Sequence, residues 1–233
     1  MNIERIALAF GILLAANTVL ASETLELKTS KEKVSYAIGM DMGNSLKKNG
    51  VDINPDVLAK AIKDVLTDQK PQITNQEAVT ILTGLQEEMQ GKRQEAMKVL
   101  GEKNKNEGAA FLVENMKKEG VKTLPSGLQY KVITEGKGKS PSATDTVTVQ
   151  YTGRLVDGTE FDSSYKRGEA ATFVVNGVVK GWTEALQLMK EGSKWQLFLP
   201  SNLAYGETGT VGGPIGPNAV LIFDVELVSL QSK

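Results

Sequence analysis

The sequence of 233 residues contains no cysteine and no histidine. Without cysteine there can be no disulfide framework, no thiol nucleophile and no thiolate zinc site. Without histidine a Ser-His-Asp triad is excluded, and only carboxylates, hydroxyls and amides remain as side-chain metal ligands. The formal net charge of −1 gives no general attraction to nucleic acids or acidic membranes. We therefore expect no metal, no cofactor and no nucleic-acid partner.

Aromatic residues are also scarce, at 6% of the chain, but they are concentrated in its last part. Ten of them follow Pro125: Tyr130, Tyr151, Phe161, Tyr165, Phe173, Trp182, Trp195, Phe198, Tyr205 and Phe223. Trp182, Phe161 or Phe223 taken alone is more often a core residue than a ligand contact. Together, in a region without histidine or cysteine, they favour a pocket that acts through shape and desolvation instead of through a nucleophile.

The first 21 residues are typical of an export signal. Arg5 precedes an apolar stretch over residues 6–14, and Val19-Leu20-Ala21 resembles a small-residue cleavage site before Ser22. The stretch is too short to cross a bilayer. A buried N-terminal helix is the alternative interpretation. We expect residues 1–21 to be a signal peptide and the mature, exported chain to begin near Ser22.

Residues from about 31 to 120 favour helices. Apolar side chains recur at helical spacing over residues 31–48, and Asn54-Pro55 is typical of the start of a second helix. No proline interrupts residues 75–118, so one helix roughly 65 Å long can follow. We interpret it as a solvated helical rod. Because each glycine costs about 1 kcal/mol relative to alanine in a helix, two helices with a break between Gly101 and Gly108 are the alternative.

The helical part, residues 22–118, has too little apolar surface to fold alone. Pairing with a second copy would bury more, and we expect a homodimer formed through the N-terminal helices. Met40 and Met42 would then lie at the dimer interface, since methionine fills irregular gaps. An intrachain core is the alternative for these two residues.

From Leu128 the apolar period changes to two. Alternating runs occupy residues 146–151, 194–199 and 221–227, and one short helical pattern covers residues 182–189. The sequence therefore predicts an α+β fold, with a C-terminal antiparallel β-sheet wrapped on one short helix over residues 119–233. An all-α dimerisation region and a long connecting helix from about residue 75 precede it.

Several short motifs in this β region are similar to those of FKBP-type peptidyl-prolyl isomerases, in the same order. They are Tyr151-Thr152-Gly153, Asp157-Gly158, Phe161-Asp162-Ser163-Ser164, Gly181-Trp182, Leu203-Ala204-Tyr205-Gly206 and Leu221-Ile222-Phe223-Asp224-Val225-Glu226-Leu227. The upstream helices, with Gly39-Met40-Asp41-Met42-Gly43, resemble the exported, dimeric macrophage infectivity potentiator (Mip) subgroup. This resemblance implies a location in the periplasm, outer membrane or cell surface of a Gram-negative bacterium.

The resemblance also implies roles for individual residues. Asp162, Tyr205 and Tyr151 would be catalytic. The apolar lining that binds proline would consist of Phe161, Trp182, Val178, Val179, Ile215 and Phe223. Trp195, Phe198 and Phe173 are interpreted as core residues. The implied partners are proline-containing unfolded or extended polypeptides, and rapamycin-type macrolides as inhibitors.

Two positions depart from the family's common pattern. Ala170-Ala171 stands where an aromatic residue is frequent, and Thr210-Val211-Gly212-Gly213 stands where a histidine is frequent. Both lie at the expected rim of the pocket. Two other functions are consistent with the sequence: a chaperone whose isomerase activity is secondary, and an interaction protein that uses its helical half.

Overall fold

The computed structural model describes residues 26–231, and its contacts divide the chain into two units, Met1–Thr74 and Asn75–Lys233. The predicted signal peptide, residues 1–21, lies outside the described residues. Within residues 26–231 no helix has the length and apolar character needed to cross a bilayer.

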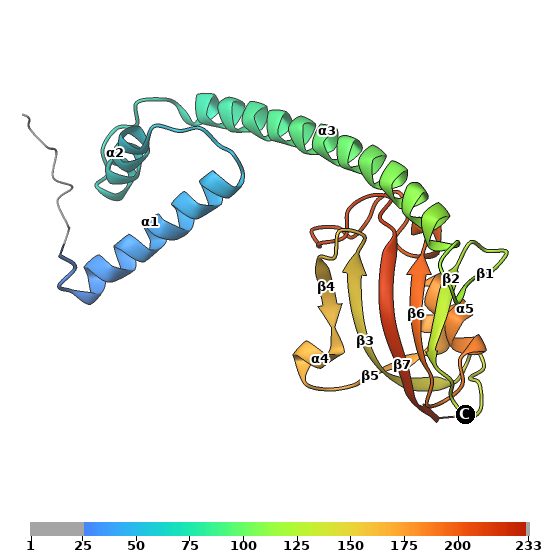
Figure 1. Ribbon diagram of the computed structural model, residues 1–233. Coiled ribbons are helices and arrows are strands. Elements are labelled where there is room, and N and C mark those ends of the chain that lie inside the picture. Colours follow the sequence, from blue (N-terminus) through green and yellow to red (C-terminus); the bar gives the residue numbers. More distant parts are fainter. Residues whose placement is uncertain (1–25, 232–233) are drawn as a thin grey trace, which may run out of the picture. The chain divides into compact units, whose positions relative to one another are not determined.

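The first unit contains two helices, α1 (Ser30–Lys48) and α2 (Pro55–Leu66) (Figure 1). A capping box begins α1: Glu32 N donates to Thr29 Oγ1 at 3.2 Å, and Thr29 N donates to Glu32 Oε2 at 2.8 Å. Asn54 caps α2 by accepting hydrogen bonds from Asp56 N and Val57 N, ahead of proline at the first helical position. In the described part of this unit α1 has no buried residue and α2 has only Asp64. The helices are therefore well specified locally, but they do not form a core of their own.

The second unit begins with α3 (Asn75–Asn115), a continuous helix of 41 residues that is roughly 60 Å long. This confirms the prediction of one long helix and contradicts a break near residues 101–108. The prediction of a solvated rod is wrong for its C-terminal half, where Gly101, Gly108 and Asn115 are buried. These residues face the β domain, so the glycines that weaken the helix also allow it to approach the domain closely.

The β domain is built on one antiparallel sheet with the strand order β1-β2-β6-β7-β3-β4, and β5 also pairs with β3. The strands are β1 (Val121–Thr123), β2 (Gln129–Thr134), β3 (Thr146–Leu155), β4 (Glu160–Ser163), β5 (Ala171–Val174), β6 (Lys194–Leu199) and β7 (Leu221–Gln231). The central strands β3, β6 and β7 confirm the predicted alternating runs. This sheet and its helix confirm the predicted α+β fold.

Strand β3 changes partner along one edge. Its other edge pairs with β7 throughout, but on this edge residues 146–149 pair with β5 and residues 152–154 pair with β4. Tyr151 lies in the gap between the two partners. The gap leaves this edge of β3 open where the aromatic cavity described below is formed.

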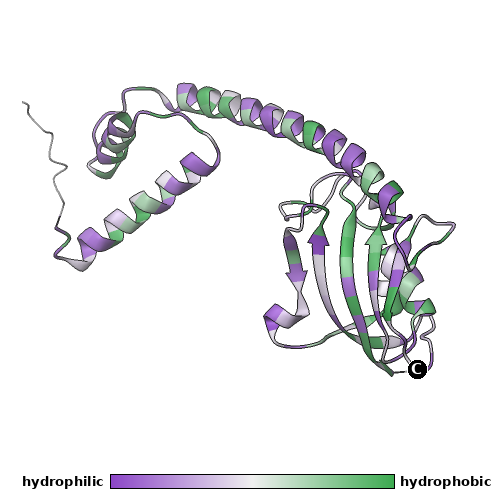
Figure 2. Ribbon diagram, in the orientation of Figure 1, coloured by the Kyte–Doolittle hydropathy of each residue, from purple (hydrophilic) through white to green (hydrophobic). Residues whose placement is uncertain are grey.

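The core lies between the sheet and α5 (Lys180–Leu188), the predicted short helix. Trp182, Ala185, Leu186 and, just after the helix, Met189 are buried against apolar residues of β3, β6 and β7. Green, hydrophobic stretches along β6 and β7 are visible in Figure 2. A further one-turn helix, α4 (Ser164–Arg167), and two 3₁₀ turns, η1 (Val175–Gly177) and η2 (Ser201–Leu203), were not predicted.

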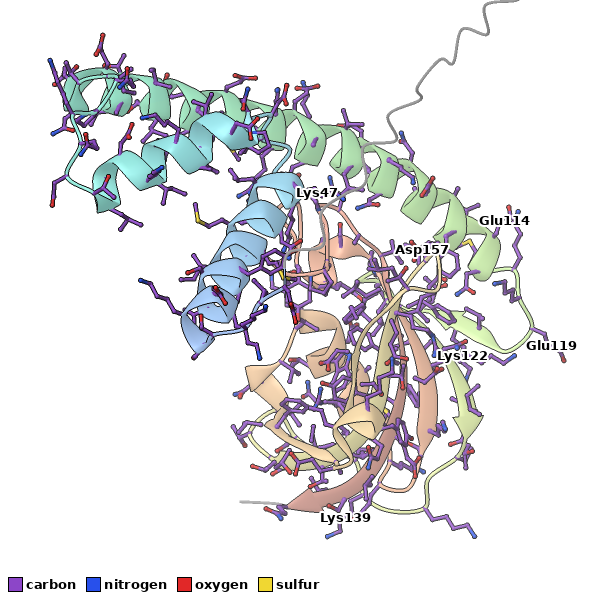
Figure 3. The ribbon with its side chains drawn as sticks, turned by 90° about the vertical axis from the view of Figure 1, so that its left-hand side faces the viewer. Lys47, Glu114, Glu119, Lys122, Lys139 and Asp157 are labelled. Atoms are coloured by element: carbon purple, nitrogen blue, oxygen red, sulfur yellow. The ribbon has the colours of Figure 1, made fainter. Side chains whose placement is uncertain are left out.

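The end of α3 contacts the sheet through Phe198, which lies on the face of β6 opposite to Trp195. Phe111 of α3 lies 6.0 Å from Phe198, centroid to centroid. Asn115 Nδ2 donates to Gln129 Oε1 at 2.9 Å, and Gln129 Nε2 donates to Leu112 O at 2.9 Å. Glu114, in the same last turn of α3, is exposed and forms an ion pair with Lys117 instead (Figure 3 labels Glu114). Phe198 is thus buried as predicted, but by α3 instead of by the central core.

Candidate active site

A cavity of about 500 Å³ opens beside the partner change of β3. Its lining comes from β3, β4, β5, the turn before α5, α5 itself, the loop after η2, and β7. The lining residues are Tyr151, Phe161, Asp162, Phe173, Gly177, Val178, Val179, Trp182, Tyr205 and Phe223. This volume suits a ring with its flanking peptide groups, and the lining is mainly apolar, as in most small-molecule sites.

Trp182 forms the floor of the cavity and is only 4% exposed. Three rings stand almost perpendicular to it: Tyr151 at 5.1 Å and 88°, Phe223 at 5.2 Å and 82°, and Phe173 at 6.1 Å and 87°. Edge-to-face pairs of this kind are favourable and fix ring orientation. The indole plane is therefore held in place by its neighbours from three strands.

One wall of the cavity is the pair Phe161 and Phe223, whose rings are 5.5 Å apart at 87°. Gly153 of β3 lies directly behind them. A Cβ atom at Gly153 would lie 2.6 Å from Phe161 Cε2 and 2.8 Å from Phe223 Cε1. The glycine in the Tyr-Thr-Gly motif is therefore required by the close packing of the two rings.

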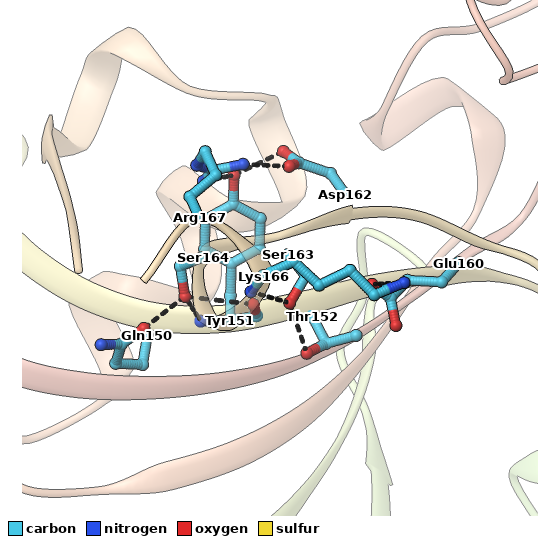
Figure 4. A network of polar contacts seen from close by, with 9 residues as sticks. All are labelled: Gln150, Tyr151, Thr152, Glu160, Asp162, Ser163, Ser164, Lys166 and Arg167. Carbon is cyan, nitrogen blue, oxygen red and sulfur yellow. Dashed lines mark hydrogen bonds and ion pairs between the residues drawn. The ribbon is translucent and has the colours of Figure 1, made fainter. Parts of the chain in front are cut away.

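The polar side of the cavity is a network of Tyr151, Asp162 and Arg167 (Figure 4). Tyr151 Oη donates to Asp162 Oδ2 at 2.5 Å, and Arg167 Nη2 donates to Tyr151 Oη at 2.9 Å. Arg167 Nη1 forms an ion pair with Asp162 Oδ1. The guanidinium also lies over the Tyr151 ring, 5.4 Å from its centroid. The one-turn helix α4 brings Arg167 back to Asp162.

Ser164 supports this network from beneath, because it fills the gap in the pairing of β3. It is fully buried, and its Oγ accepts a hydrogen bond from Tyr151 N at 2.8 Å. The same hydroxyl donates to Gln150 Oε1 at 2.5 Å, with Tyr151 O also within reach at 3.2 Å. Figure 4 shows Ser164 between Gln150 and Tyr151. The side chain thus replaces the ladder partner that Tyr151 lacks and satisfies its backbone.

The network also sets the ionisation of its members. Burial and the hydrogen bond to Asp162 raise the pKa of Tyr151, so its hydroxyl stays protonated and can donate. Desolvation acts to raise the pKa of Asp162, but the hydrogen bonds from Tyr151 and Arg167 outweigh it and lower that pKa below its ordinary value. Asp162 is therefore a carboxylate with fixed partners, which is unsuited to proton transfer near neutral pH.

The structure brings together eight of the nine site residues named from the sequence. Tyr205 lines the mouth of the cavity with 40% of its surface exposed, and Val178 and Val179 line the turn before α5. Ile215 is not among the lining residues; it belongs to the loop that follows Tyr205, and its side chain is buried in the core. Phe173, interpreted from the sequence as core, packs on the core and also lines the cavity. No signal in the sequence distinguished Phe173 from a core aromatic residue, and the motif that contains Ser164 did not indicate a role for its side chain.

Comparison with known families covers nearly all of the described chain. Residues 31–132 match the family described as the domain amino terminal to FKBP-type peptidyl-prolyl isomerase. Residues 137–228 match the family described as FKBP-type peptidyl-prolyl cis-trans isomerase, and this second match contains every residue that lines the cavity.

Individual relatives agree with the family matches. The chain is 46% identical to the outer membrane protein MIP of Legionella longbeachae, over 99% of both chains. It is 43% identical to the peptidyl-prolyl cis-trans isomerase Mip of Coxiella burnetii, over 97% of this chain and 96% of that protein. The crystal structure of FkpA from Escherichia coli matches with a TM-score of 0.66 and 38% identity, over 88% of this chain and 99% of that one. The chain therefore belongs to the FKBP-type peptidyl-prolyl cis-trans isomerases, in their Mip-like group.

Proposed function

We propose that the chain accelerates cis-trans isomerisation of X-Pro bonds by holding the proline ring over Trp182, without a covalent intermediate. The observation that carries this proposal is the aromatic enclosure of Trp182, with a carboxylate and a phenol at its edge. An enclosure of this size accepts a five-membered ring but offers it no nucleophile.

The physical reason for catalysis lies in the amide bond. Rotation has a barrier of about 18–20 kcal/mol because resonance makes the bond planar, and the planar form is more polar than the twisted one. An X-Pro bond populates both isomers, since its nitrogen is a tertiary amide. A desolvated aromatic cavity disfavours the polar planar form relative to the twisted transition state, which lowers the barrier.

Tyr205 and Asp162 would add orientation at the edge of the cavity. The Tyr205 hydroxyl would donate a hydrogen bond to a carbonyl of the substrate, which fixes the peptide on one side of the proline. Asp162 would polarise the amide or orient its neighbours as a carboxylate, with Tyr151 and Arg167 keeping it in place. Rapamycin-type macrolides would compete for the same apolar enclosure.

The clients would be proline-containing unfolded or extended polypeptides in the compartment to which the chain is exported. The names of relatives, including an outer membrane protein, support export to the periplasm or cell surface of a Gram-negative bacterium. The exposed apolar side chains of α1 support a homodimer through the N-terminal helices. Val34 and Ile38, one helical turn apart on α1, are each more than half exposed in the single chain, so a second copy is the natural partner for this face.

A chaperone function, with isomerase activity secondary, is the second candidate. The same exposed face of α1 favours it, since apolar side chains can hold an unfolded client. The two functions differ in their dependence on the cavity, because holding a client would survive loss of the Tyr205 hydroxyl.

A refolding assay limited by proline isomerisation tests the proposal. We expect the wild-type chain to accelerate the slow phase, and we expect Asp162→Ala and Tyr205→Phe to reduce this acceleration. If the wild-type chain only prevents aggregation and leaves the slow phase unchanged, the isomerase role in folding is wrong and the chaperone function is favoured.

A further inference from the structure

Tyr205 is carried by a loop that α3 contacts at its other end. We call residues 204–220 the 204–220 loop; it connects η2 with β7. Tyr205, near its beginning, lines the cavity, whereas Pro217 and Asn218, near its end, contact α3. The residue that lines the cavity and the residues that contact the helix are therefore parts of one segment.

The two ends of the loop are hydrogen-bonded to each other beside Tyr205. Asn218 N donates to Gly206 O at 2.9 Å, and Gly206 N donates to Ser201 O at 2.8 Å. Asn218 adopts a positive φ of 55°, a conformation that asparagine tolerates better than most residues. A displacement of Asn218 would therefore move the residue next to Tyr205.

Two side-chain hydrogen bonds attach this closed loop to α3. Asn104 Nδ2 donates to Pro217 O at 2.8 Å, and Asn218 Nδ2 donates to Gly101 O at 3.3 Å. The bonds run in opposite directions, one from the helix to the loop and one from the loop to the helix. Together they fix both the separation and the register of the loop on the helix.

The attachment is close because two glycines face it. A Cβ atom at Gly101 would lie 3.2 Å from Pro217 Cβ, and one at Gly216 would lie 2.9 Å from Leu100 Cδ2. A cavity of about 160 Å³ beside the junction is lined by Leu100, Asn104 and Gly216, and also by the β3–β4 turn that carries Asp157 (Figure 3). The loop therefore contacts the helix at a defined seam that has open space along one side.

Apart from the backbone of its own loop, few contacts fix the position of the Tyr205 side chain. Within residues 26–231 its hydroxyl forms no hydrogen bond to another residue, and the side chain is 40% exposed. Its place over the cavity is set by the backbone of its own loop. A shift of about 1 Å in such a group is enough to change a rate strongly, because catalysis depends on orientation.

We propose that Asn104 and Asn218 are positioning residues that make α3 part of the active site, by holding the 204–220 loop so that Tyr205 faces the proline. This inference rests on the proposed role of Tyr205. It assigns to the connecting helix a function in turnover, in addition to joining two parts of the chain.

The test uses the full chain and the variants Asn104→Ala and Asn218→Gly. Asn218→Gly removes the bond to Gly101 O but keeps the backbone bond to Gly206, and glycine accepts the positive φ. We expect each variant to lower kcat/KM on a short X-Pro peptide about three- to ten-fold, which corresponds to the net contribution of one hydrogen bond. Gly91→Ala is the matched control in α3, because a Cβ there meets nothing within 4 Å; we expect no change in its kcat/KM.

A double-mutant cycle separates positioning from general damage to the fold. We expect Asn104→Ala to lower kcat/KM less than two-fold when Tyr205→Phe is already present. An equal loss in both backgrounds, or no loss in the wild-type background, would overturn the proposal.

A second measurement does not depend on turnover. In chains labelled with 3-fluorotyrosine, the ¹⁹F resonance of Tyr205 is the one that Tyr205→Phe removes. We expect it to shift in Asn104→Ala and Asn218→Gly and to stay unchanged in Gly91→Ala. If Tyr205→Phe retains full activity, the catalytic role of Tyr205 is wrong, and this resonance still decides whether α3 positions the side chain: an unchanged resonance in both asparagine variants would refute it.

Discussion

The hydroxyl of Tyr151 donates to Asp162 Oδ2 at 2.5 Å, at the polar edge of an otherwise aromatic cavity. Burial and the hydrogen bond to Asp162 keep the Tyr151 hydroxyl protonated, and the hydrogen bonds from Tyr151 and Arg167 keep Asp162 charged. The edge of the cavity thus keeps one charge state over a wide range of pH.

A flat pH profile follows from this relationship. The pKa of Asp162 is lowered, so its contribution is present above its ordinary pKa and is lost only as the pH falls through the lowered value. The pKa of Tyr151 is raised, so its proton is lost only above the ordinary tyrosine range. The chain has no histidine, and no ordinary side chain titrates between about pH 5 and 8. We expect kcat/KM on an X-Pro peptide to be constant over that range; a bell-shaped profile centred there would indicate acid–base catalysis instead.

The two tryptophans allow occupancy of the cavity to be measured directly. Trp182 forms the cavity floor, whereas Trp195 is buried and stacked on Tyr130 at 4.4 Å. We expect a bound proline peptide to change the fluorescence of the wild-type chain and of Trp195→Phe, but not that of Trp182→Phe. A ligand-induced change that persists in Trp182→Phe and disappears in Trp195→Phe would place the ligand elsewhere.

Gly153→Ala tests the packing behind the cavity wall. The added methyl group would lie within 3 Å of the Phe161 and Phe223 rings, so the rings must move or the strand must shift. We expect a loss of about 1–3 kcal/mol in the free energy of unfolding, measured by urea denaturation, and weaker peptide turnover. Gly91→Ala has open space around it, and its better helix propensity should stabilise the chain by up to about 1 kcal/mol. Equal effects of the two variants would refute this account of the wall.

Ile38→Asp tests the proposed dimer. Ile38 is 57% exposed on α1, and a carboxylate there would be buried without a partner if a second copy covers it. We expect the variant to sediment as a monomer and to keep its turnover of short peptides, because the cavity lies in the other unit. Asn44→Asp adds the same charge to α1 at an exposed polar position and should leave the dimer intact. A wild-type chain that sediments as a monomer would contradict the proposal outright.

The sequence predicted the elements that have strong local signals. Helical spacing, caps and the strict alternation of β3, β6 and β7 located the main helices and strands, because each pattern reflects burial on one side of one element. The family resemblance then located most of the cavity lining. What the sequence did not show depends on contacts between distant segments. Ser164 is important because β3 changes partner at Tyr151, and no local pattern records that gap.

The connecting helix shows the same limit most clearly. From the sequence alone, its glycines indicate destabilising positions in a solvated helix. In the structure, Gly101 and Gly108 are buried against Pro217 and Val220, which follow more than a hundred residues later. The expected domain boundary at residue 118 reflects a change in periodicity. The hydrogen bonds of Gln129 with Asn115 and Leu112 cross that boundary, so α3 and the sheet are in direct contact there.

The most direct test of the central claim is the rate of cis-trans exchange in an X-Pro peptide, measured by NMR exchange spectroscopy. The uncatalysed exchange takes tens to hundreds of seconds at 25 °C. We expect catalytic amounts of the wild-type chain to shorten it greatly without changing the cis:trans ratio, and we expect Tyr205→Phe and Asp162→Ala to be slower by about ten-fold or more. Exchange that stays at the uncatalysed rate with the wild-type chain, or that is equally fast with both variants, would contradict the proposed cavity mechanism.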